Sequence, residues 1–414
     1  MSGPLAGIKV LELAQIMAGP TCGLMLADLG ADVIKVERVP GGDDTRMMNR
    51  PSVRGESAAF LAMNRNKRGI ALNLKLPAAQ EALKRMVARA DVLTENYRQG
   101  TMAKLGMGYE ALKALNPRLI YCSISGYGRT GPYAEKGGYD LIAQGMSGLM
   151  SITGEPGRAP AKSGAPVCDI NAGLLAALGV VSAYIHRLKT GEGQLVDTSL
   201  FEAGIQQTYW QSAIYFATGE APGPGGSAHH LSAPYQAFRA ADGWLTIGGA
   251  NQGNWERLVR VLGAPEWLVD ERFSTNADRM KNLAHLTPLI NEKLKARPVR
   301  QWIAALDAEG VPCGPINSIA DMAADPQALA REMVVELDHP RAGATRALGL
   351  PIKLSASPGK VVRPAPLLGQ HTREVLAEFG FSASEIEALV NSAPRSAPDI
   401  ILQADKNERL GGWL

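Results

Sequence analysis

The sequence predicts an α/β fold, in which a large domain with a doubly wound parallel sheet is joined to a smaller α+β domain. Short apolar, β-branched segments alternate with helical segments over the first 200 residues. The composition changes near residue 216, where ATGEAPGPGGSAHHLSAP (217–234) is rich in Gly and Pro. At 414 residues, the chain is also longer than one hydrophobic core usually serves.

The first elements are a strand, a turn, a helix and a second strand. They are IKVLEL (8–13), AQIMAGP (14–20), TCGLMLADLG (21–30) and ADVIKVE (31–37). Both strands are short and mostly apolar, as expected of strands in a parallel sheet that is covered on its two faces.

The alternation continues along the chain. The further strands are expected at GIALNL (69–74), DVLTEN (91–96), RLIYCSIS (118–125) and QLVDTSL (194–200). The helices between them include PAAQEALKRMVARA, YEALKALN and a long apolar helix at about 170–188, which ends at KTGEG. Such alternation predicts a Rossmann-like, doubly wound domain.

Beyond the glycine-rich segment, YQAFRAADGWLTIGG predicts a hairpin that turns at Asp242-Gly243. The helices NWERLVRVLG and VRQWIAALDAEG follow. We therefore expect a large domain over 1–200, a linker and glycine-rich loop over 201–230, and a small α+β domain over 231–325. Residues 326–414 would form a return linker and the C-terminal part of the large domain, with a last amphipathic helix at SASEIEALVNS.

Composition and charge narrow the class of protein. The net charge of +3 with scattered basic residues argues against nucleic-acid binding. The four cysteines form no CxxC pair, which favours a reducing cytoplasm. Glu12 interrupts the only early apolar stretch, so no signal peptide is expected. The apolar run 172–185 is too short to span a bilayer and suits a buried helix, so we expect no membrane partner.

The first turn and the rest of the sequence were compared with known cofactor and catalytic motifs. The first turn carries one glycine, Gly19, where a dinucleotide site needs G-x-G-x-x-G, although Glu37 ends the second strand where a ribose-binding acid would lie. There is no phosphate-binding G-x-x-x-x-G-K-[ST] loop and no G-x-S-x-G elbow. The six histidines lack metal-ligand spacing, so no metal is expected, and His229 and His230 favour a surface loop.

Basic and amide residues recur where the predicted strands end. Ligands of open α/β sheets collect at this edge, and repeated cations there indicate a ligand with several phosphates. Each of these residues taken alone is equally well explained as a solvated side chain. The residues are Arg38, Lys75, Asn96 and Arg98, with Lys104 and Lys136 further along.

One acid stands in apolar surroundings. Asp169 lies in GAPVCDINAGLLAALG (164–179), directly before a run of small apolar residues. It is either the N-cap of the following helix or a nucleophile, and the two roles are compatible because the helix dipole would hold the carboxylate ionised. The neighbouring Cys168 is an alternative nucleophile, but no histidine partner accompanies it.

As a whole, the sequence resembles the class III CoA-transferases, a family that includes formyl-CoA transferase. The similarity runs in order through nearly the full chain. It includes AGPTCGLMLADLGADVIKVERVPGGDDTR, NRNKRGIALNLK, DVLTENYRQG, YCSISGYGRTGPYAEKGGYD, SGLMSITG, KTGEGQLVDTSL and PLLGQHT. The segments GDDTR, YCSISGYGRTGP and GLMSITG resemble most the branch that uses dicarboxylates, such as the succinate–hydroxymethylglutarate enzymes.

The resemblance implies roles for individual residues. Asp169 would be the covalent nucleophile, and a closing loop over the acyl group would be formed by Gly225, Gly226, Ser227 and His229. It implies coenzyme A contacts at Met17, Ala18, Arg38, Leu72, Lys75, Asn96, Tyr97, Lys104, Lys136, Gly137, Gly138, Tyr139 and Asp140, and Arg98 belongs to the same strand-end set. It also implies an interlocked homodimer, with the small domain inserted between portions of the large one.

The resemblance implies a CoA-transferase that moves CoA from a thioester such as succinyl-CoA to a free, dicarboxylic acid through an aspartyl intermediate. CoA thioester is then a substrate, and no permanently bound cofactor is expected. The alternatives are a 2-methylacyl-CoA racemase of the same superfamily and a non-catalytic CoA-binding protein. Racemases carry a histidine where Tyr139 stands, and tyrosine is a poor base near neutral pH. Met17 replaces a glutamine of formyl-CoA transferase, and Lys104 replaces an arginine, which loses bidentate phosphate geometry.

Overall fold

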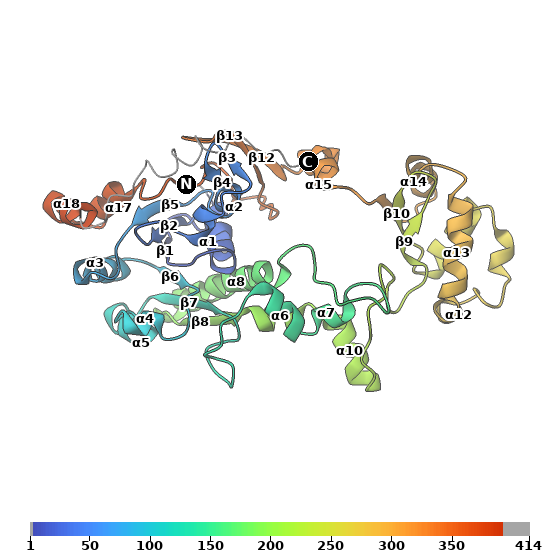
Figure 1. Ribbon diagram of the computed structural model, residues 1–414, viewed down its shortest axis with the longest axis horizontal. Helices are drawn as coiled ribbons and strands as arrows, with labels where there is room; N and C mark the ends of the chain where they lie inside the picture. Colours follow the sequence, from blue (N-terminus) through green and yellow to red (C-terminus); the bar gives the residue numbers. More distant parts are fainter. Residues whose placement is uncertain (1–2, 392–414) are drawn as a thin grey trace, which may run out of the picture. The chain divides into compact units, whose positions relative to one another are not determined.

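The structure, a computed structural model, describes residues 3–391, which form two compact units (Figure 1). The first unit contains the residues up to 147, residues 164–207 and the residues from 326 onward. The second unit contains residues 148–163 and 208–325.

The first unit is built on a sheet of six parallel strands, which confirms the predicted α/β class. Its strand order is β5-β2-β1-β6-β7-β8. The chain moves outward from β1 through β2 to β5 and then returns to β6 on the other side of β1. The carboxyl ends of β1 and β6 therefore form the switch point, where open α/β sheets bind ligands. The strands are β1 Lys9–Glu12, β2 Asp32–Glu37, β5 Arg68–Ala71, β6 Val92–Glu95, β7 Ile120–Ser125 and β8 Leu195–Ser199.

Helices cover this sheet, and local sequence signals fix several of their ends. Pro77 occupies the first turn of α3, where its missing N–H costs nothing. The predicted stop of the long helix α8 is confirmed at Gly191, which has φ +83°. The helices are α1 Ala18–Asp28, α2 Ala58–Met63, α3 Pro77–Val87, α4 Thr101–Lys104, α5 Tyr109–Leu115, α6 Asp140–Met146, α8 Val167–Thr190 and α9 Leu200–Gln206.

The C-terminal part of the chain packs back onto the same sheet. Val375 of α17 Thr372–Glu378, Phe379 directly after it and Ile386 of α18 Ala383–Asn391 lie in the core. They belong to the same cluster as Leu11 and Leu93. Before these helices come α16 Pro326–Ala330 and the hairpin of β12 Val334–His339 and β13 Gly343–Leu348. The predicted last helix is present as α18, while the rest of the chain predicted for this part, 392–414, lies outside the described residues.

The second unit is a small α+β body around an antiparallel sheet of order β11-β10-β9. The hairpin predicted around Asp242-Gly243 is present, with Arg239 opposite Trp244. Trp255, Phe238 and Trp302 fill its core. Its elements are α7 Leu149–Ile152, α10 Tyr209–Thr218, β9 Tyr235–Arg239, β10 Trp244–Gly248, α11 Gln252–Val261, α12 Asn276–Lys281, α13 Leu283–Leu294, α14 Val299–Ala308, β11 Cys313–Pro315 and α15 Ile319–Ala324.

Two expected boundaries differ from the structure. The segment 201–230 contains helices α9 and α10 as well as loop. Ser199 caps the first of these helices by accepting a hydrogen bond from the N–H of Glu202. Residues 148–163, expected in the large domain, belong to the second unit. There the N–H of Gly226 donates a hydrogen bond of 2.9 Å to the carbonyl of Gly154.

Helix α8 is longer than its apolar run indicated. With 24 residues it is, by length and composition alone, long and apolar enough to cross a membrane, so the expectation that it is too short was wrong. Core helices of soluble proteins pass the same test, and 39% of its apolar window is buried. The expectation of a buried helix holds on one face only, because Leu178 and Leu188 are exposed.

Candidate active site

A cleft of about 330 Å³ opens at the carboxyl ends of the strands of the first unit. The residues that follow β1 and β6 form two of its walls, so it lies at the switch point of the sheet. Asp44, Ser125 at the end of β7, Leu200 after β8 and residues of the loop 134–139 also line it, together with Asp169.

Close packing of two helices brings Asp169 to this cleft. Asp169 is the third residue of α8, and Gly173, one turn further on, lies against α1. A Cβ at Gly173 would come within 2.5 Å of the carbonyl oxygen of Ala18 and of Thr21 Cβ. Since only glycine permits this approach, α8 begins beside the first turn of α1, where Met17 and Ala18 line the cleft.

The interpretation of Asp169 as an N-cap was wrong. Pro166 occupies the N-cap position, and no side chain of the helix caps it. Instead, Asp140 Oδ1 accepts hydrogen bonds from the backbone N–H groups of Cys168 (2.9 Å) and Asp169 (3.3 Å). The Asp140 carboxylate receives a further bond of 2.6 Å from Gln144 Nε2. An acid 29 residues away thus takes the capping role, and the carboxyl of Asp169 is left for the cleft.

The surroundings of Asp169 raise its pKa to about 7. Burial is the larger cause because it disfavours the charged form, and the negative charge of Asp140 adds to it. The expectation that this carboxylate is held ionised was therefore wrong, because burial and the charge of Asp140 both favour its protonated form. Both protonation states are then accessible near neutral pH, which suits a residue that alternates between nucleophile and leaving group.

Cys168 is not a candidate nucleophile. Its side chain is buried, and a Cβ at Gly204 of α9 would lie 3.0 Å from its sulfur. Burial, with the charges of Asp140 and Asp169, raises the pKa of its thiol to about 12. The thiolate that nucleophilic chemistry requires is then essentially absent at neutral pH.

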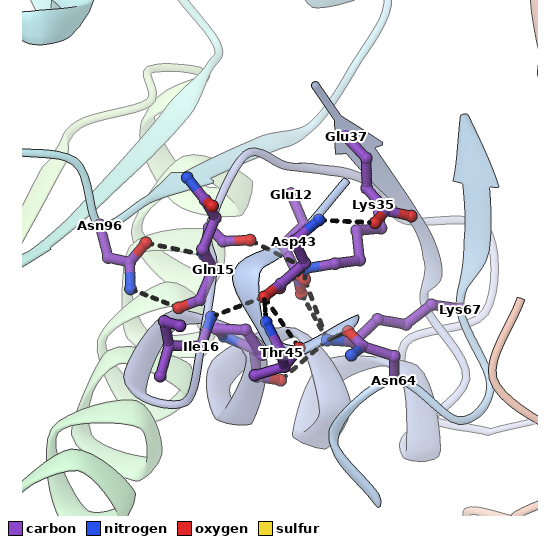
Figure 2. A network of polar contacts seen from close by, with 12 residues as sticks. Glu12, Gln15, Ile16, Lys35, Glu37, Asp43, Thr45, Asn64, Lys67 and Asn96 are labelled. Atoms are coloured by element: carbon purple, nitrogen blue, oxygen red, sulfur yellow. Dashed lines mark hydrogen bonds and ion pairs between the residues drawn. The ribbon is translucent and has the colours of Figure 1, made fainter. Parts of the chain in front are cut away.

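A chain of buried charges lies beside the β1–α1 turn (Figure 2). Lys35 Nζ contacts Glu12 Oε1 at 3.1 Å and Asp43 Oδ2 at 2.8 Å, and Lys67 Nζ contacts Glu12 Oε2 at 2.8 Å. Burial opposes the charge of Lys35, but attraction to Glu12 and Asp43 outweighs it and raises the pKa of Lys35. Burial also acts against the charge of Asp43, yet Lys35 lowers the pKa of Asp43 to about 2. The four groups form an alternating chain of opposite charges, as buried ions require.

The structure brings together about two thirds of the expected coenzyme A contacts. Those that line the cleft are Met17, Ala18, Asn96, Tyr97, Arg98, Lys136, Gly137, Gly138 and Tyr139. The others do not line it: Arg38 is ion-paired with Asp44, and the Leu72 side chain is buried in the core at 1% exposure. Lys75 and Lys104 are exposed outside the cleft lining, and Asp140 bonds the start of α8.

The expected closing loop belongs to the second unit. Ser227 Oγ accepts a bond of 3.1 Å from the N–H of Ala237, and His229 stacks on Tyr235 with ring centroids 5.2 Å apart. These contacts, with the bond from Gly226 to Gly154, give the loop a defined shape within its unit. The role of Gly225, Gly226, Ser227 and His229 over an acyl group stays a prediction.

Sequence reasoning missed several lining residues that carry no charge. All but Ala134 lie at or shortly after strand ends, the same signal that singled out the cations. The residues are Gln15, Ile16, Gln99, Ile124, Ser125, Gly126, Ala134 and Leu200. Gly126 has a further reason to be glycine. A Cβ on it would lie 2.7 Å from the Cα of Gly138, so the 136–139 loop reaches the cleft only because two glycines meet.

Comparison with known proteins adds to this geometry. The model of CoA-transferase family III matches residues 5–372. A succinate–glutarate CoA-transferase of Agrobacterium fabrum is 44% identical over 91% of this chain and 96% of its own. A succinyl-CoA:mesaconate CoA-transferase of Haloarcula marismortui is 39% identical over 91% of this chain and 97% of its own. Among solved structures, a CAIB/BAIF family protein from Brucella suis is 44% identical, with a TM-score of 0.82 over 92% of this chain and 100% of that one.

Proposed function

The chain belongs to CoA-transferase family III and is a CoA-transferase, and on this premise we propose that it moves CoA from succinyl-CoA to a second dicarboxylic acid with Asp169 as covalent nucleophile. The observation that carries this proposal is the position of Asp169. Its carboxyl lines the cleft at the switch point and has a pKa raised to about 7.

The names of the relatives support the choice of substrates. The Agrobacterium enzyme is named for succinate and glutarate, and the Haloarcula enzyme for succinyl-CoA and mesaconate. Both pairs consist of dicarboxylic acids. In this chain, Arg98 and Lys136 line the cleft and supply positive charge for the phosphates of CoA or for a free carboxylate.

In the first half-reaction, an oxygen of ionised Asp169 attacks the thioester carbonyl carbon of succinyl-CoA. The C–S bond breaks, CoA leaves as the thiolate, and a mixed anhydride joins succinyl to Asp169. The thiolate then attacks the carbonyl carbon of Asp169. Succinate leaves with the anhydride oxygen, and an aspartyl-CoA thioester remains.

The second half-reaction runs through the same steps in reverse order with the acceptor. A carboxylate oxygen of the acceptor attacks the aspartyl thioester, which releases the thiolate and forms a new anhydride. The thiolate attacks the acceptor's carbonyl carbon, giving the new acyl-CoA and regenerating ionised Asp169. One thioester replaces another, so the exchange needs no ATP to drive it.

Trapping the covalent intermediate tests the proposal. Wild-type protein is incubated with succinyl-CoA alone, treated with hydroxylamine and digested. The mass of the peptide that contains residues 165–185 is then measured by mass spectrometry. A hydroxamate on Asp169 is the expected product. Its absence under conditions in which succinyl-CoA is turned over would remove Asp169 from the mechanism. A parallel reaction in D₂O with a 2-methylacyl-CoA tests the racemase alternative through exchange of the α-proton.

We also infer a cytoplasmic homodimer, interlocked as the family resemblance implies. Ile170, Leu174, Leu178, Ile185 and Leu188 are exposed on α8. Their spacing places all five on one stripe of the helix. A second copy that covers this apolar stripe would remove it from water. The four free cysteines are consistent with a reducing compartment.

A further inference from the structure

The turn between β1 and α1 is strained at a residue that lines the cleft. Ile16 has φ +67°, in the left-handed region. For a β-branched residue this conformation is an outlier, because its side chain crowds the backbone, and it costs on the order of 1–3 kcal/mol. Such a conformation persists only where the surrounding structure holds it.

Asn96, which follows β6, holds this turn from one side. Its Oδ1 accepts a bond of 2.8 Å from the N–H of Gln15, and its Nδ2 donates a bond of 2.8 Å to the carbonyl of Gln15. The Asn96 amide thus bonds both backbone polar groups of Gln15 (Figure 2). These bonds link the end of β6 to the end of β1 at the switch point. The two bonds also fix the plane of the Asn96 amide.

Asp43 holds the same turn from the opposite side. Its Oδ1 accepts a bond of 3.2 Å from the N–H of Ile16, the strained residue itself. Asp43 cannot easily move, because Thr45 donates to the same oxygen through its N–H (2.9 Å) and its hydroxyl (2.8 Å). Lys35 pairs with the other carboxylate oxygen and donates a bond of 2.9 Å to the carbonyl of Ala14. The turn is therefore bonded at Ala14, Gln15 and Ile16 in succession.

Gly19 completes the fit of the turn against α1. A Cβ at this position would lie 2.1 Å from the Cβ of Ala14 and 3.4 Å from Cγ of Asn96. The single glycine of the turn thus makes room for the clamped backbone.

We propose that Asn96 and Asp43 are positioning residues, which clamp the strained Gln15–Ile16 turn in the shape that the reaction cleft requires. The Asn96 side chain then holds the backbone of the turn in place. Its loss lowers kcat and leaves the affinity for CoA nearly unchanged. This inference rests on the proposed function, because the turn carries Met17 and Ala18 to the cleft that contains Asp169. A displacement of cleft walls by about 1 Å lowers turnover roughly 100-fold in well-oriented reactions.

The first experiment compares Asn96→Ala with Asn116→Ala. Asn116 is a matched control, since its amide donates bonds of 2.9 and 3.0 Å to the carbonyls of Val87 and Ala90 and it does not line the cleft. For Asn96→Ala we expect kcat for CoA transfer to fall at least tenfold, while the Kd for free CoA changes by less than about threefold. Asn116→Ala should lower stability but leave kcat within about twofold. A tenfold rise in Kd at unchanged kcat would instead make Asn96 a CoA ligand and overturn the proposal.

A second experiment relieves the strain. Glycine adopts the left-handed region freely, so Ile16→Gly should make the turn less dependent on its clamp. We expect Asn96→Ala to reduce kcat at least threefold less in the Ile16→Gly background than in the wild-type background. Equal reductions in both backgrounds would overturn the link between clamp and strain.

Hydrogen–deuterium exchange separates failure of this inference from failure of the proposed function. In the protein without substrate, the amides of Gln15 and Ile16 should exchange at least tenfold faster in Asn96→Ala and in Asp43→Ala than in wild type and in Asn116→Ala. Unchanged exchange overturns the clamp even if the wild type transfers CoA. Faster exchange supports the clamp even in a protein that fails to transfer CoA to dicarboxylates.

Discussion

The carboxylate of Asp140 accepts a hydrogen bond from the backbone N–H of Asp169, with 3.3 Å between Oδ1 and N. One acid therefore caps the helix on which the other is carried, and its charge also raises the pKa of that second acid. Capping fixes the position of Asp169 at the cleft, and the nearby charge sets the pH at which Asp169 ionises. The two effects can be separated by substitution.

The nucleophile assignment predicts a sharp contrast between two neighbouring positions. Asp169→Ala should abolish CoA transfer, because no carboxylate remains to take the acyl group, while the Kd for CoA stays within about threefold. Cys168→Ala should keep transfer within about fivefold, because its thiol is buried and protonated. Initial rates and equilibrium binding measure both. Full activity in Asp169→Ala, or inactivity of a folded Cys168→Ala, would contradict the assignment.

Transfer should depend on pH through Asp169. Only the ionised carboxylate attacks, so the single-turnover rate of acylation should rise with pH to a plateau, with a midpoint near 7. Asp140→Asn keeps an oxygen for capping but removes the negative charge. Its midpoint should therefore move to lower pH. A midpoint that is the same in both proteins would show that Asp140 does not influence this titration.

The same shift has a consequence for stability. The pKa of Asp169 is raised in the folded state, so ionisation of this carboxyl lowers the free energy of unfolding. The loss is absent below the unfolded pKa near 4, and it is complete above about pH 7. Asp169→Asn should therefore be more stable than wild type at pH 8, by on the order of 1 kcal/mol after allowance for the partly open cleft. At pH 4 the two should unfold alike. Urea unfolding at both pH values checks this, and a larger gain at pH 4 would reverse the sign.

The pattern of strands and helices made the sheet predictable, because apolar β-branched runs such as VIKV carry their own signal. The geometry of the candidate site was harder to predict from the sequence. The capping of α8 depends on Asp140, which is distant in sequence, so the local sequence left Asp169 open as either the cap or a nucleophile. The side chain of Ile16 has no polar group. Only its backbone angle and the bond from its N–H to Asp43 identify it as part of the site. Lys35 is likewise buried between Glu12 and Asp43, which come from two other segments of the chain, so its ion pairs could not be predicted locally.

The buried charge chain predicts a large loss of stability when one member is removed. Glu12→Gln leaves Lys35 and Lys67 facing each other without a counter-ion between them. The free energy of unfolding should fall by about 3–5 kcal/mol. Glu292→Gln is the control, since it breaks an exposed ion pair with Lys295 and should change stability by less than about 1 kcal/mol. Similar losses in the two variants, measured by urea unfolding, would argue against the chain as a stabilising unit.

The exposed stripe of α8 predicts the assembly state. Leu178 is 63% exposed on this stripe, so Leu178→Glu should leave the folded chain intact. It would, however, place a charge in the proposed contact between two copies, and burying an unpaired charge is costly. Light scattering after gel filtration should therefore show a dimer for wild type and monomer for Leu178→Glu. Leu115→Glu is the control, because Leu115 is 45% exposed at the end of α5 and outside this stripe, and it should remain dimeric. A wild-type protein that elutes as a monomer at micromolar concentration, or a Leu178→Glu dimer as tight as the control, would show that α8 is not the contact.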